Sequence, residues 1–96
     1  MNSLYAKSCL IIKLVYEIKS KKIRLFSEKF VNNNVRYCKM VINNKICELI
    51  DEYETFDDKM KLLKARLYVL NNEKINYGYM FYECDSLIDF SIITKE

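Results

Sequence analysis

Apolar and polar residues alternate along the first third of the chain with the period of a half-buried β-strand. The apolar face of residues 11–19 consists of Ile12, Leu14, Tyr16 and Ile18. A second β-type run, residues 23–26, follows a short Ser-Lys-Lys link. Because two nearby strands joined by a short link commonly pair, the pattern predicts an antiparallel hairpin here.

A short helix and a second hairpin are predicted next. Ser27 stands where a helix N-cap would, and Phe30 and Val31 follow at helical spacing, which favours a helix over residues 28–33. Residues 36–42 then alternate again and run into the turn sequence Asn-Asn-Lys at 43–45. Asparagine tolerates the left-handed backbone region, so this turn predicts a hairpin with residues 46–50.

The segment 60–70 fits two structures. Leu63, Ala65, Leu67 and Val69 alternate as in a strand, whereas Met60, Leu63, Leu67 and Leu70 lie on one face of a helix. Periodicity leaves both alternatives open. The acidic residues before this segment predict a loop or an irregular strand end.

Composition indicates one small folded domain. The chain has 96 residues, of which 51% are hydrophobic and 30% charged, as in ordinary globular proteins. It contains one glycine and no proline, and asparagine pairs and a triplet stand where turns are expected.

Charge and hydropathy exclude some classes of partner. The formal net charge is +3 and the basic residues are scattered, so we expect no nucleic-acid binding. No apolar run approaches the ~18–20 residues of a membrane span. Lys7 and Lys13 interrupt the N-terminal apolar residues, so a secretory signal is not expected either. These features predict a cytoplasmic protein.

The cysteines do not form a metal-binding pattern. Cys9, Cys38, Cys47 and Cys84 include no C-x-x-C pair, and the chain has no histidine to complete a zinc site. We expect small buried thiols in a reducing compartment.

No group of residues predicts an active site. The acids Asp51, Glu52, Glu54, Asp57 and Asp58 lack the ligand order of a calcium-binding loop, and consecutive acids are usually solvated. The single glycine, Gly78, cannot form a glycine-rich phosphate loop. We therefore expect no catalytic residue, no cofactor and no bound metal.

Three tyrosines form the candidate interaction surface. Tyr77, Tyr79 and Tyr82 lie close together in the sequence, and tyrosine is enriched at protein interfaces. Half-buried positions in the wall of the fold would explain them equally well.

The last quarter of the chain carries a repeat signature, Met-Phe-Tyr-Glu-Cys-Asp-Ser-Leu at residues 80–87. Upstream, Lys-Ile-Arg-Leu-Phe at 22–26, Glu-Lys-Phe-Val-Asn-Asn-Asn at 28–34 and Cys-Lys-Met-Val-Ile-Asn-Asn-Lys at 38–45 keep the order of a leader domain. Together they resemble the leader domain and first repeat of BspA-like leucine-rich repeat proteins of protists.

This resemblance implies an α+β fold: a small antiparallel sheet of about five strands with one short helix, followed by a single leucine-rich-repeat-like coil. It makes residues 11–72 the leader domain and residues 73–96 a repeat unit packed on it. Residues 1–10 match neither the strand pattern nor the resemblance and are expected to be an N-terminal extension that need not be ordered. The resemblance also favours a strand over residues 60–70. A repeat coil would point inward the side chains of Met80, Phe81, Cys84, Leu87 and Phe90.

The resemblance implies a non-catalytic protein-interaction module. The family usually continues as a tandem array, and a proline-containing turn that often follows the Ser-Leu core is absent here. A single repeat leaves its stacking edge open, so we expect a protein partner or self-association through the repeat surface or that edge. The alternative is a self-contained β-grasp-like regulatory domain in which residues 60–90 complete the fold.

Overall fold

The computed structural model describes residues 2–94. Met1 and residues 95–96, at the outer ends of the predicted extension 1–10 and repeat unit 73–96, lie outside the described residues. The described part of the chain forms these elements: α1 (Asn2–Lys7), β1 (Leu10–Glu17), β2 (Lys22–Arg24), α2 (Glu28–Asn34), β3 (Cys38–Ile42), β4 (Lys45–Glu48), β5 (Glu52–Glu54), β6 (Leu62–Val69) and β7 (Leu87–Thr94).

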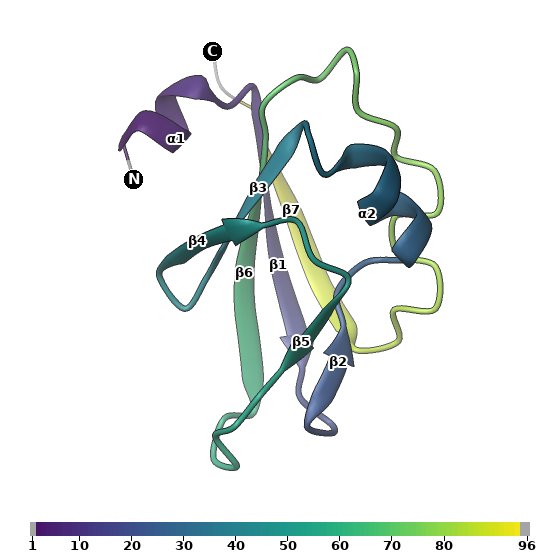
Figure 1. Ribbon diagram of the computed structural model, residues 1–96. Coiled ribbons are helices and arrows are strands. Elements are labelled where there is room, and N and C mark those ends of the chain that lie inside the picture. The colour runs from purple at the N-terminus through teal and green to yellow at the C-terminus, as the bar shows by residue number, and fades with distance from the viewer. Residues whose placement is uncertain (1, 95–96) are drawn as a thin grey trace.

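An antiparallel five-stranded sheet, in the order β4-β3-β6-β1-β7, dominates the fold (Figure 1). The short strands β2 and β5 pair separately as a two-stranded ribbon. The predicted α+β class with a small antiparallel sheet is therefore confirmed.

The expected hairpin between residues 11–19 and 23–26 is wrong. Strand β1 pairs with β6 over eight consecutive residue pairs, from Leu10 opposite Val69 to Glu17 opposite Leu62. Its other edge pairs with β7, so both hydrogen-bonding edges of β1 are occupied. The three-residue strand β2 pairs with β5 instead. Long-range pairing of the three eight-residue strands β1, β6 and β7 decides this topology, and a local pattern cannot reveal it.

Residues 62–69 form a strand, which resolves the helix–strand ambiguity in favour of the strand. Strand β6 lies between β3 and β1 and pairs with both. Leu63, Ala65 and Leu67 are buried on one face of the sheet. Tertiary pairing on both sides thus outweighs the helix propensity of the sequence.

The main core lies between the sheet and the elements covering its inner face, α2 and the β2–β5 ribbon. Tyr16, Phe26 and Phe30 are completely buried there. The Tyr16 hydroxyl donates a hydrogen bond of 2.7 Å to the carbonyl of Leu25, which ties the sheet to the chain that leads into α2. Burial raises the pKa of Tyr16, so its phenol stays protonated.

Helix α1 covers one end of the opposite, outer face of the sheet. Its Leu4 is buried against Ile11, Val41 and Tyr68, which come from three neighbouring strands. This helix lies in the segment for which the sequence predicts only an extension. None of the helices within residues 2–94 is long or apolar enough to cross a membrane.

Two local predictions hold in detail. Ser27 caps α2, because its hydroxyl accepts a hydrogen bond of 3.1 Å from the backbone N–H of Phe30. Asn43 and Asn44 join β3 to β4 with φ angles of 51° and 64°. A two-residue hairpin loop of type I′ needs positive φ at both positions, and asparagine accommodates this better than most residues.

Candidate interaction surface

The segment between β6 and β7 carries the three candidate tyrosines in a series of turns. Their side chains are exposed: Tyr77 by 41%, Tyr79 by 57% and Tyr82 by 59%. Tyr79 and Glu83 have φ angles of 61° and 58° and lie in consecutive turns of the chain. These turns present the phenol rings to solvent.

The structure brings Tyr79 and Tyr82 together. Their ring centroids are 6.0 Å apart in an edge-to-face arrangement, and the Lys29 ammonium of α2 lies 4.4 Å from the Tyr79 centroid. Such contacts fix the rings without hiding them. The two tyrosines border a hollow of about 370 Å³ that is also lined by Arg24 and Glu83.

Tyr77 belongs to a different surface. Its hydroxyl donates a hydrogen bond of 3.0 Å to the Asn72 side chain, and its ring lines an apolar groove beside β7. Burial, followed by Cys38 and Cys9, raises the pKa of Tyr77. The three candidate residues are therefore divided between two hollows.

Asn34 and Met80 anchor this segment to the rest of the fold. The buried Asn34 amide donates hydrogen bonds to the carbonyls of Phe30 (2.8 Å) and Asn76 (2.7 Å), and its Oδ1 accepts one of 2.7 Å from the Asn76 N–H. The Met80 side chain joins the main core, and its carbonyl accepts a hydrogen bond of 3.1 Å from the Ser27 N–H. The tyrosine-bearing turns are held against α2.

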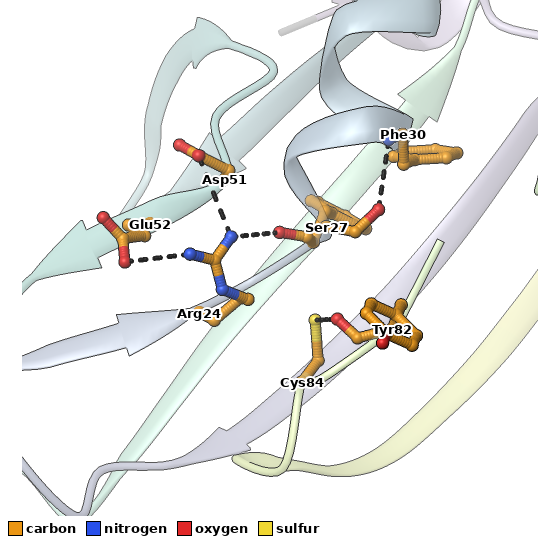
Figure 2. A network of polar contacts seen from close by, with 8 residues as sticks. Arg24, Ser27, Phe30, Asp51, Glu52, Tyr82 and Cys84 are labelled. Carbon is orange, nitrogen blue, oxygen red and sulfur yellow. Dashed lines mark hydrogen bonds and ion pairs between the residues drawn. The ribbon is translucent and has the colours of Figure 1, made fainter. Parts of the chain in front are cut away.

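Arg24 lines the same hollow as Tyr79 and Tyr82, and it lies near Ser27 at the start of α2 (Figure 2). Its guanidinium lies 3.8 Å from the Asp51 carboxylate and 3.2 Å from that of Glu52, and it donates a hydrogen bond of 3.3 Å to the Phe26 carbonyl. Two of the five acids that the sequence analysis considered are thus held by one arginine. These ion pairs link the two strands of the β2–β5 ribbon, and the hydrogen bond from Arg24 to Phe26 connects the ribbon to the chain that leads into α2.

The Cys84 thiol is packed in the fold. It is 8% exposed and lies 3.6 Å from the Tyr82 carbonyl, to which it donates (Figure 2). Burial, partly offset by Arg24, raises its pKa to about 11. A thiol in this state is a poor nucleophile at neutral pH.

Strand β7 forms an apolar edge of the sheet. It pairs with β1 on one side, and no described strand lies on its other side. Ile88, Phe90, Ile92 and Ile93 are 54%, 51%, 55% and 37% exposed. Phe90 is half-exposed although the repeat pattern predicts an inward position, because no further described strand covers it. Its one aromatic neighbour among the described residues is Phe81, at 5.8 Å between ring centroids.

A groove of about 410 Å³ runs along this edge. Its walls come from β1, β7 and the tyrosine-bearing segment, with Leu10, Ile12, Tyr77, Met80, Phe81, Phe90 and Ile92 among the lining residues. The lining also includes Asn72, which is its one residue that is neither apolar nor aromatic. The groove therefore extends the apolar strip of β7 onto the adjoining face of the sheet.

The opposite edge of the sheet is shorter and carries charges at its ends. Strand β4 has only four residues, and Lys45 and Glu48 place charges at its two ends. Short, charged edge strands resist pairing with other chains, whereas long apolar ones promote it. Of the two edges, β7 is the one suited to accept another strand.

No family model, curated protein or solved structure matches this chain. The inference of function therefore depends on the geometry of the chain itself.

Proposed function

We propose that the chain is a non-catalytic protein-interaction module that binds another polypeptide strand along β7. The observation that carries this proposal is the eight-residue edge strand with four apolar side chains at least 37% exposed. An added strand would pair with the free backbone groups of β7 and would cover these side chains.

A second copy is the natural partner for the isolated chain. The β7 strands of two copies can pair antiparallel about a two-fold axis, and each would then cover the other's apolar strip. In a longer array, the next repeat coil would occupy the same edge, as the resemblance to BspA-like repeats implies. Tyr77 borders the groove beside this edge and would contact the added strand.

Amide hydrogen exchange at low and high protein concentration tests this proposal. We expect the amides of β7 to become protected as concentration rises, because pairing satisfies them. The amides of β4, on the other edge, are the internal control and should not change. Equal exchange of β7 at both concentrations would refute strand addition.

A self-contained regulatory domain is the second candidate function. It is favoured by the pairing of β7 along β1 from Leu10 to Tyr16 and by the burial of Met80 in the main core. In this case residues 60–90 complete the fold, and β7 is an ordinary edge strand. Both candidates place the protein in the cytoplasm, a proposal supported by four cysteines that are all free thiols.

A further inference from the structure

The outer face of the sheet contains a trough beyond the end that α1 covers. Its volume is about 730 Å³, and the outward-facing Val15, Val41 and Leu62 supply apolar lining. Lys13, Lys64 and Arg66 also line it, from the adjacent strands β1 and β6. The trough reaches the outer face of β7 at Asp89 and Ser91, but it shares no lining residue with the groove beside that strand or with the hollow at the tyrosine-bearing turns.

The three cations lie together on the outer face of the sheet, and none of them is paired with an acid among the described residues. Lys13 lies directly opposite Arg66 in the β1–β6 register, and Lys64 is two positions before Arg66, on the same face. None of the three forms an ion pair or a side-chain hydrogen bond with another described residue. Like charges directly opposite each other destabilise a sheet, so this arrangement has a cost for the free chain.

Another cation on the same face of the sheet is paired with an acid. Lys39 on β3 lies opposite Glu48 on β4, and the two side chains form an ion pair. In the trough the one acidic lining residue is Asp89, opposite Val15 on the far side of β1 from Lys64. The trough therefore keeps a net positive charge.

We propose that this trough binds an acidic, extended segment of a partner protein. Lys64 and Arg66 are separated by about 6.7 Å along the strand, which is also the distance between alternate side chains of an extended peptide. Acids at alternate positions would meet Lys64 and Arg66, and Lys13 would contribute to the same field. The apolar lining suits an apolar side chain of the peptide.

The lining disfavours a nucleic acid. Single-stranded nucleic acids bind to aromatic side chains on which bases stack, and no aromatic residue lines the trough. Asp89 would also repel a phosphate backbone. The chemistry therefore favours carboxylates on a peptide.

Fluorescence anisotropy with a labelled Glu-Val-Glu-Val-Glu-Val peptide tests the proposal on the full chain. We expect saturable binding that weakens about tenfold in the Lys64→Glu/Arg66→Glu variant, because two attractive contacts are replaced by repulsion. The Lys21→Glu/Lys74→Glu variant is the matched control: it has the same net charge, with both changes at exposed positions outside the strands, and should bind as the unmodified chain does. Circular dichroism melts of both variants establish that they are folded.

Three outcomes would overturn the proposal. The first is no binding of the peptide to the unmodified chain. The second is an equal loss of binding in the two double variants, which would show that net charge alone attracts the peptide. The third is tighter binding of a labelled oligouridylate than of the peptide, which would assign the trough to nucleic acid. None of these three outcomes predicts a change in the concentration dependence of hydrogen exchange in β7. The failure of this proposal can therefore be distinguished from the failure of the proposed function.

Discussion

At the scale of single residues, Asn34 connects two distant parts of the chain. Its side chain is completely buried and makes three hydrogen bonds, one to its own helix and two to the backbone of Asn76. Within the described residues no buried side-chain nitrogen or oxygen lacks a partner. The asparagine triplet is visible in the sequence, but only the fold distinguishes its last member from the two exposed ones.

Replacing Asn34 by alanine should lower the free energy of unfolding by about 3 kcal/mol, because both backbone groups of Asn76 lose their partner in a partly buried site. Asn33→Ala, one residue earlier on the exposed face of the helix, should change it by less than about 0.5 kcal/mol. Urea denaturation measures both values. Equal effects of the two substitutions would show that the Asn34 contacts do not stabilise the fold.

At the scale of elements, the sheet assembles features that are separated in the sequence. Helix α2 with its Ser27 cap and the Asn43–Asn44 hairpin could be predicted, because each depends on neighbouring residues. The partners of β1 could not, because they are set by which long strands pair. For the same reason the basic residues look scattered along the chain, although the β1–β6 register places Lys13 opposite Arg66.

Removing the like-charge pair should stabilise the sheet. Arg66→Glu places an acid opposite Lys13 and should raise the free energy of unfolding by about 0.5 kcal/mol. The matched control is Arg36→Glu, which makes the same change at an exposed position outside the strands. If thermal or urea unfolding shows Arg66→Glu to be no more stable than the control, the two cations do not repel each other in the folded chain.

At the scale of the whole molecule, the segment after β6 completes the sheet with β7, and no described strand pairs with the outer edge of β7. Strand β7 covers one edge of β1, and Met80 fills part of the core, so the segment after β6 is integral to the fold. Its outer edge nevertheless exposes an apolar strip. The sequence indicated the Tyr77, Tyr79 and Tyr82 surface, but it could not show that Tyr77 joins a groove beside β7 while the other two lie beside α2.

Deletion of residues 76–96 should abolish cooperative unfolding, because it removes β7 and takes the buried Met80 side chain out of the core. Near-ultraviolet circular dichroism and a thermal melt would report this loss of tertiary structure. A shortened chain that still melts cooperatively would mean that the tail is an appendage on an independent leader domain.

The most direct test of the open edge is the molar mass of the purified chain, measured by multi-angle light scattering over a concentration series. We expect a dimer that forms with rising concentration and disappears in Ile92→Lys, because an edge lysine opposes strand pairing. Ile46→Lys introduces the same change on β4, at a side chain 51% exposed against 55% for Ile92, and should leave the dimer intact. A monomer at every concentration, or an equal effect of the two substitutions, would contradict the proposal that β7 is an association surface.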